Sequence, residues 1–214
     1  MRVIYLSDND VVEKLAICDL LDDALEAFDA EPSDVLVLPT LKHRIGIGSP
    51  RPKTVKRLGE VVASRLTLFL ASVGEVREHS AADHDLLESL DESVEIDAGE
   101  IILLSATAMV SDYLLLTGDK RCIRAVASHP ECAGIAARIQ GRVVCFEQVV
   151  LRIIDRNGFD AVSSKIVPAL HCDTALRAAF GSGEHATRAN ACACLESYIA
   201  DLRGFPMDLL MPGH

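Results

Sequence analysis

Short apolar segments that alternate with helical patterns are the feature that most constrains the fold of this chain. Each apolar run is a few residues long and ends at a polar turn, which is typical of a strand buried on both faces of a sheet. The runs occupy residues 3–6, 35–38, 113–117 and 143–146. Because parallel strands need helical crossovers, strands alternating with helices predict an α/β fold with a mainly parallel sheet.

The helices are predicted from apolar residues that recur at helical spacing. They are expected at residues 11–28, 53–73, 81–90, 100–109, 120–128 and 147–154. The last part of the chain shows helical patterns without a clear strand, so we expect two further helices near residues 160–180 and 184–203. This predicts an α/β domain at residues 1–157 and a helical extension at residues 158–214. The extension would cap the first domain or form an oligomer interface, such as that of a homodimer.

Composition indicates a globular protein of the cytoplasm. Half of the 214 residues are apolar and Trp is absent, so the core must be built from Leu, Ile, Val and Ala. The apolar runs are too short to cross a membrane, and the N-terminus lacks a signal-peptide pattern. The cysteines are odd in number and scattered, which favours reduced thiols. They are Cys18, Cys122, Cys132, Cys145, Cys172, Cys192 and Cys194.

A zinc site near the C-terminus is the alternative interpretation of some of these cysteines. Its ligands would be drawn from Cys192 and Cys194, with His171, Cys172 and His185 upstream. The spacing of these residues fits no zinc motif, so cysteines on a helix face are the favoured interpretation.

Charge is unevenly distributed along the chain. The net charge of -11 argues against non-specific nucleic-acid binding by the whole surface. However, no acidic residue lies between Asp34 and Glu60, a stretch that carries Lys42, His43, Arg44, Arg51, Lys53, Lys56 and Arg57. Such a basic segment either contacts phosphates or is a solvated loop and helix start.

Carboxylates stand directly beside the predicted strands. Asp8 and Asp10 follow the first strand, Asp119 follows the third, and Asp97 and Glu100 begin the helix before it. If the two strands are neighbours, Asp8, Glu100 and Asp119 converge in the crevice where open α/β sheets bind ligands. Converging carboxylates repel one another unless protons or a cation neutralise them, and Mg²⁺ prefers oxygen ligands. Each acid taken alone is also explained as a helix cap or a first-turn carboxylate.

The order of these motifs resembles the PIN-domain nucleases. The segment Leu6-Ser7-Asp8-Asn9-Asp10 is similar to the family's first strand and its Asp. The segment Asp97-Ala98-Gly99-Glu100 looks like the acid that begins an Ala-rich helix, and Thr117-Gly118-Asp119-Lys120-Arg121 resembles the family's Thr-x-Asp followed by a basic residue. The segment Gly141-Arg142-Val143-Val144-Cys145-Phe146, followed by a helix, resembles the family's last strand. The resemblance covers roughly residues 1–157 and implies a three-layer α/β/α fold.

The resemblance implies a metal-dependent ribonuclease. Asp8, Glu100 and Asp119 would hold Mg²⁺ or Mn²⁺, assisted by Asp97 or Asp10. The cation would acidify water and stabilise the phosphate. Small PIN proteins are often toxins of toxin–antitoxin pairs, so the expected partners are RNA and an antitoxin or another protein.

One departure from the family pattern opens alternatives. The family usually places another acid in the helix after the second strand, where this chain has Lys42-His43-Arg44. Lys42 and Arg44, together with Lys120 and Arg121, would instead contact substrate phosphates. The chain would then be a nuclease with an altered site, or a PIN-like protein that binds RNA or protein without cleaving. A phosphatase of the haloacid dehalogenase type, suggested by Asp8-Asn9-Asp10 alone, is the third alternative.

Overall fold

The computed structural model is built around five parallel strands. It describes residues 3–90 and 96–213, so the outermost residues of the two predicted parts, 1–2 and 214, lie outside it. The strand order is β3-β2-β1-β4-β5. The strands are β1 (Ile4–Ser7), β2 (Val35–Val37), β3 (Gly74–Glu75), β4 (Tyr113–Thr117) and β5 (Val143–Cys145). The predicted α/β class with a mainly parallel sheet is confirmed.

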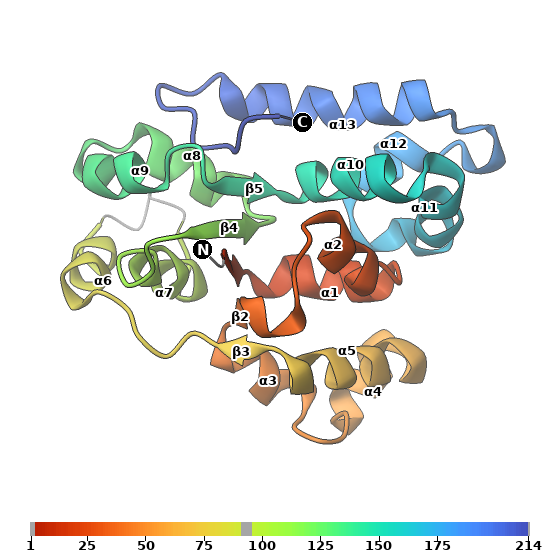
Figure 1. Cartoon of the computed structure of the whole chain (residues 1–214), viewed down its shortest axis with the longest axis horizontal. Coiled ribbons are helices and arrows are strands. Elements are labelled where there is room, and N and C mark those ends of the chain that lie inside the picture. The colour runs from red at the N-terminus through yellow and green to blue at the C-terminus, as the bar shows by residue number, and fades with distance from the viewer. Residues whose placement is uncertain (1–2, 91–95, 214) are drawn as a thin grey trace.

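Helices flank the sheet on both sides (Figure 1). The first half of the chain contributes α1 (Asn9–Ile17), α2 (Leu21–Ala27), α3 (Pro39–Ile45), α4 (Pro52–Leu58), α5 (Glu60–Ser72) and α6 (Ala81–Glu88). The second half contributes α7 (Ala98–Ala106), α8 (Lys120–Ser128), α9 (Ala133–Ile139), α10 (Phe146–Asn157), α11 (Phe159–Ile166), α12 (Thr174–Phe180) and α13 (Arg188–Arg203). Short 3-10 turns are η1 (Pro32–Asp34), η2 (Pro130–Cys132), η3 (Val167–Cys172) and η4 (Gly183–His185).

The sheet reverses its winding direction once. The chain moves outward from β1 to β2 and β3, then returns past β1 to β4 and β5. Because β-α-β crossovers are right-handed, the two directions place their helices on opposite faces. Helices α6 to α9 accordingly lie on one side in Figure 1, and α1, α2 and α5 on the other.

Three predicted helices are interrupted, and local backbone geometry explains two of the breaks. The helix expected at residues 11–28 is divided at Asp19, whose φ of 58° leaves the helical region. The helix expected at residues 53–73 is divided at Gly59, which has a φ of 79° and no side chain to oppose it. The segment near residues 160–180 is two α-helices joined by η3. Sequence periodicity also missed β3, α3 and α9.

The C-terminal helices share the core of the α/β part. Buried apolar residues from both parts form one continuous cluster, in which Leu195 of α13 and Ile153 of α10 are fully buried. The chain end then returns to the sheet edge, where Val143 donates to the Leu209 carbonyl and accepts from the Met211 N–H. The extension therefore covers α10 and the β5 edge in this chain.

Candidate acidic cleft at the carboxyl ends of the strands

Strands β1 and β4 are neighbours, as the convergence of the acids requires. Leu6 pairs with Leu115 and Ser7 with Leu116, although more than a hundred residues separate them in sequence. The Asp8 N–H extends this pairing by donating to the Leu116 carbonyl at 2.9 Å. The sheet reverses direction between these two strands, and open α/β sheets bind ligands at such a point.

Four aspartates occupy the N-cap positions of four helices around this point. They are Asp8 of α1, Asp97 of α7, Asp119 of α8 and Asp173 of α12. The last three accept capping hydrogen bonds from backbone N–H groups, and for Asp119 this is the capping role that the sequence offered as its local interpretation. Asp8 makes no such capping bond. Capping therefore accounts for three of these carboxylates and leaves Asp8 without that explanation.

A cleft of about 970 Å³ brings these acids together. The predicted acids Asp8, Asp10, Asp97, Glu100 and Asp119 all line it. Three predicted basic residues, Arg44, Lys120 and Arg121, line it as well. Lys42 is absent from the lining, because its amine donates to the Val73 carbonyl at 2.8 Å and lies 3.7 Å from Glu75.

Glu100 is the most deeply buried of the predicted acids, at 5% exposure. Its Oε2 accepts from the Asp97 N–H at 2.8 Å, and Asp97 accepts in turn from the Glu100 N–H at 2.9 Å. This reciprocal capping box fixes the side chain at the start of α7. Burial, and then the charges of Asp119, Asp97 and Asp8, raise the pKa of Glu100 to about 8 against a partial lowering by the Asp97 N–H. The charges of Asp8, Asp97 and Asp119 therefore all act on Glu100.

The other two predicted ligands differ in how their charge is supported. Burial and the neighbouring Asp10 raise the pKa of Asp8 to about 6, although the Asn9 and Asp10 N–H groups oppose the rise. For Asp119, burial is outweighed by hydrogen bonds from Arg121 and the Cys122 N–H, so its pKa lies below the ordinary value. At neutral pH the cleft therefore contains an ionised Asp119 beside Asp8 and Glu100, whose ionisation is opposed.

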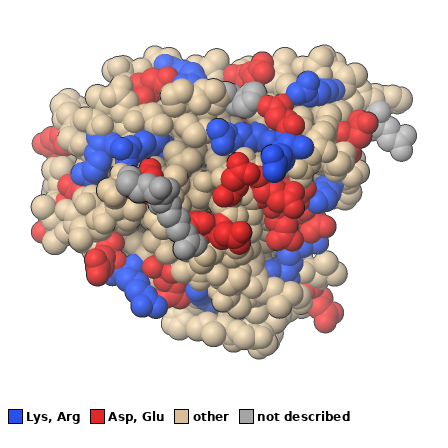
Figure 2. All heavy atoms as spheres, in the orientation of Figure 1, with Lys and Arg blue, Asp and Glu red and all other residues tan. Residues whose placement is uncertain are grey.

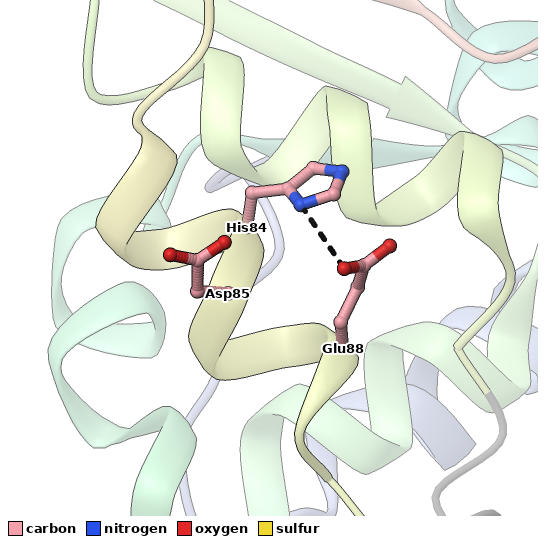
Figure 3. Close-up of side chains that lie close together, drawn as sticks. All are labelled: His84, Asp85 and Glu88. Carbon is pink, nitrogen blue, oxygen red and sulfur yellow. Dashed lines mark ion pairs between the residues drawn. The ribbon is translucent and has the colours of Figure 1, made fainter.

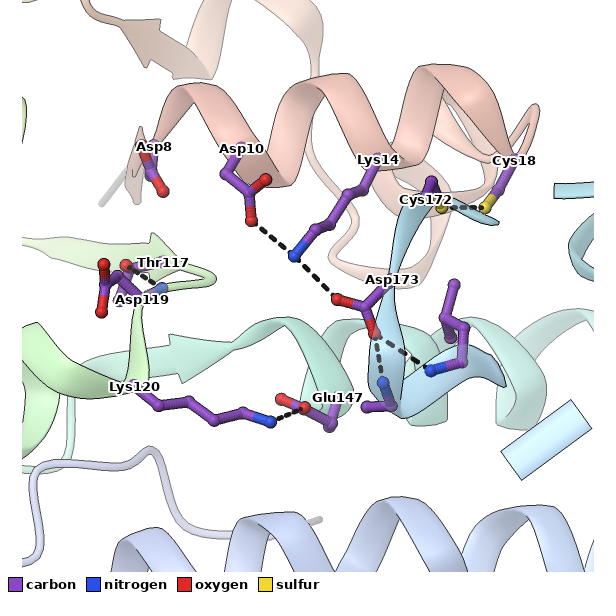
Figure 4. A network of polar contacts seen from close by, with 12 residues as sticks. Asp8, Asp10, Lys14, Cys18, Thr117, Asp119, Lys120, Glu147, Cys172 and Asp173 are labelled. Carbon is purple, nitrogen blue, oxygen red and sulfur yellow. Dashed lines mark hydrogen bonds and ion pairs between the residues drawn. The ribbon is translucent and has the colours of Figure 1, made fainter. Parts of the chain in front are cut away.

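Lysines from α1 and α8 offset part of the negative charge. The Lys14 amine lies 2.5 Å from Asp10 and 2.7 Å from Asp173, and Figure 4 shows it between the two carboxylates. Lys120 lies 2.5 Å from Glu147. The Lys120 amine also stands over the Tyr198 ring at 4.0 Å. On the face drawn in Figure 2, acidic and basic side chains adjoin one another.

Arg44 has an acidic partner that the sequence alone did not predict. Arg44 and Arg57 both pair with the buried carboxylate of Glu13 on α1, Arg57 at 2.7 Å. Glu13 lies on α1 and Arg44 lies on α3, so this ion pair connects the two helices. Both guanidinium groups remain about half exposed and line the cleft.

Sequence analysis missed Glu13, Lys14, Glu147 and Asp173, which also line the cleft or bridge its walls. Lys14 is four residues after Asp10 on one helix, a spacing that could have indicated their pairing. Glu147 follows β5 as Asp119 follows β4, which is the same strand-end signal. Asp173 belongs to the extension, and nothing local in the sequence places it at this sheet edge.

Groups of side chains close enough to share a metal ion are a separate feature from acidity. Within the described residues, one group of three potential ligands has its atoms within 4.8 Å of one another: His84, Asp85 and Glu88 on α6. Figure 3 shows His84 paired with Glu88, at 3.6 Å. The side chains of Glu88 and Asp85 are exposed, so a surface ion pair explains the group. Among the described residues, no three acids of the cleft have ligand atoms within 4.8 Å of one another.

Comparisons with known proteins gave no match. No family model, curated protein or solved structure is significantly similar to this chain.

Two expectations concern features outside the cleft. All seven cysteines, which we expect to be reduced, are free in this structure. Across residues 3–90 and 96–213, no helix combines the length and the apolar character needed to cross a membrane.

Proposed function

We propose that this protein is a metal-dependent ribonuclease with a PIN-like site. The observation that carries the proposal is the meeting of Asp8, Glu100 and Asp119 in one cleft. Asp8 follows β1, Asp119 follows β4 and Glu100 lies in the first turn of α7, and all three line the cleft at the reversal point of the parallel sheet. Such a set of oxygen ligands suits Mg²⁺ or Mn²⁺.

The electrostatics of the cleft favour a cation. Glu100 and Asp8 have pKa values of about 8 and about 6, because burial and neighbouring carboxylates penalise their charged forms. A divalent cation would remove that penalty. When bound, it supplies positive charge that stabilises a phosphate and acidifies water. The residues that would hold it are Asp8, Glu100 and Asp119, with Asp97 and Asp10 beside them.

The protein's own residues would position the substrate. Lys120 is held between Glu147 and the Tyr198 ring, so its amine is fixed at the cleft wall. Arg121 is exposed and donates to Asp119, which places a guanidinium at the mouth. Cationic groups at these positions can hold phosphate oxygens and keep the scissile bond near the acids.

A second candidate function is RNA or protein binding without cleavage. It is favoured by Arg44 and Arg57, which line the cleft from the side where a further metal ligand was expected. Both guanidinium groups pair with the single carboxylate of Glu13, so positive charge remains to attract a phosphate. Neither arginine offers an oxygen ligand to a metal ion.

Cleavage of labelled single-stranded RNA in the presence of Mn²⁺ or EDTA separates these functions. The proposal predicts Mn²⁺-dependent cleavage that is lost in Asp8→Asn and Asp119→Asn. Asp160→Asn, an exposed acid on α11, is the matched control and should cleave normally. Circular dichroism of each variant verifies folding.

Three results would contradict the nuclease proposal. Folded protein that binds RNA in EDTA but never cleaves it would support the binding function, especially if Arg44→Gln weakens binding. Cleavage that survives both site substitutions would indicate a contaminating nuclease. Turnover of a phosphate monoester that depends on Asp8 would support a phosphatase.

A further inference from the structure

Two cysteines far apart in sequence meet beside the cleft. The Cys18 and Cys172 sulfurs lie 3.7 Å apart, although 154 positions separate them along the chain. Cys18 ends α1, and Cys172 ends η3 in the C-terminal extension. Figure 4 shows the pair at the opposite end of α1 from Asp8. The contact therefore joins the first helix of the α/β part to the extension.

A salt bridge holds the same two elements together one helical turn away. Lys14 precedes Cys18 by four residues on α1, and Asp173 follows Cys172 directly. The Lys14–Asp173 ion pair, at 2.7 Å, has both side chains largely buried. Asp173 is fixed further by capping α12. The thiols are consequently presented to each other by a rigid framework, which favours a reaction between them.

The two thiols differ in access and reactivity. Cys18 is fully buried, whereas Cys172 is partly exposed. The hydrogen bond shared with Cys18 lowers the pKa of Cys172, with a smaller contribution from the Lys14 charge, and these outweigh the effects of burial and of the Asp173 charge. An accessible thiol with a lowered pKa beside a second thiol is the arrangement of an attacking and a resolving cysteine.

We propose that Cys18 and Cys172 form an oxidation site, at which a peroxide converts the thiol pair into a disulfide that ties the C-terminal helices to α1. The Cys172 sulfur attacks one peroxide oxygen, the O–O bond breaks, and a sulfenic acid and water form. The Cys18 sulfur then attacks the Cys172 sulfur, the S–O bond breaks, and the Cys18 proton leaves in a second water. Hydrogen peroxide is thereby reduced by two electrons and the two thiols are oxidised.

Only a short movement is needed for bond formation. The sulfurs must approach from 3.7 Å to the disulfide length of about 2.05 Å. The bond would close a loop that spans most of the chain. It would reinforce the connection that Lys14 and Asp173 already make at the cleft wall.

Peptide mapping of the full chain tests the proposal. Reduced protein is treated with hydrogen peroxide, its remaining thiols are alkylated, and tryptic peptides are identified by mass spectrometry. Cleavage after Lys14, Lys42, Lys165 and Arg177 places Cys18 in residues 15–42 and Cys172 in residues 166–177, each as the sole cysteine of its peptide. The expected product is these two peptides joined, lighter by two hydrogen atoms and separated by dithiothreitol.

Two serine variants provide the comparison. Cys172→Ser should abolish the joined peptide. Cys192→Ser, at another partly exposed thiol, should leave it intact. Oxidised wild-type protein should also melt roughly 5–10 °C higher than reduced protein, a difference absent in Cys172→Ser.

The wild-type map alone decides the matter, even if a variant fails to fold. Recovery of the two peptides unjoined after peroxide treatment, or of Cys172 joined to a different cysteine, would overturn the proposal. This readout involves no metal and no RNA, so it is independent of the nuclease test.

Discussion

Replacing Glu100 with Gln should stabilise the metal-free protein at alkaline pH. Glu100 is buried among acids, so its ionisation is opposed in the folded state and unopposed in the unfolded state. Gln removes the charge but keeps an oxygen that can accept the Asp97 N–H, so the capping box can persist. The substitution therefore isolates the free-energy cost of ionising Glu100 in the folded protein.

The sign and size of the effect follow from the pKa of Glu100. Its pKa rises from 4.5 in the unfolded chain to about 8 in the folded one. Protonated Glu100 contributes to the free energy of unfolding. This contribution is fully present below the pKa of Glu100 in the unfolded chain, and it is lost as pH rises through the pKa of Glu100 in the folded protein. The full shift corresponds to an upper bound of about 5 kcal/mol above pH 8. Wild type and variant should thus have similar stability near pH 4, and the variant should gain as pH rises to 8.5.

The assay is urea unfolding in EDTA at several pH values, followed by circular dichroism. Glu196→Gln, which removes the same charge from an exposed position on α13, should show no comparable pH-dependent gain. A variant whose stability runs parallel to wild type from pH 4 to pH 8.5 would refute the reasoning, because Glu100 would then ionise freely. Adding Mn²⁺ should stabilise wild type more at pH 8 than at pH 6, since binding requires deprotonated carboxylates.

Three further predictions concern the frame around the cleft. Glu13→Gln should reduce stability by about 2 kcal/mol in urea unfolding, because Arg44 and Arg57 lose their shared buried partner; an unchanged midpoint would contradict this role. Gly46→Ala should cost roughly 2 kcal/mol or more, since Gly46 has a φ of 125° and an added Cβ would lie 2.2 Å from a backbone oxygen of its own loop. Leu195→Ala should cost about 2–5 kcal/mol by leaving a cavity under α13. Because the two parts share a core, calorimetry of Leu195→Ala should show the whole chain unfolding in one transition at a lower temperature, and an unchanged main transition would indicate independent domains.

The sequence by itself determined the fold class and most of the acids in the cleft. Strand β4 and helix α8 were predicted at their observed bounds, because local apolar patterns and the N-cap Asp119 are sufficient to define them. Asp8 and Asp119 were predicted to meet because each ends a buried strand, and parallel strands end at one edge. Periodicity could not locate the breaks at Asp19 and Gly59, since apolar spacing continues through a backbone turn.

Only the tertiary structure decided what surrounds those acids. The pairing of Glu13 with Arg44 joins α1 to α3, and the Lys14–Asp173 pair joins α1 to the extension. Such contacts depend on how helices pack in space, across 31 residues for Glu13 and Arg44 and more than a hundred for Lys14 and Asp173, and no local pattern encodes them. The pKa of Glu100 is decided in the same way. Its burial and its acidic neighbours exist only once α7, β1 and β4 have come together.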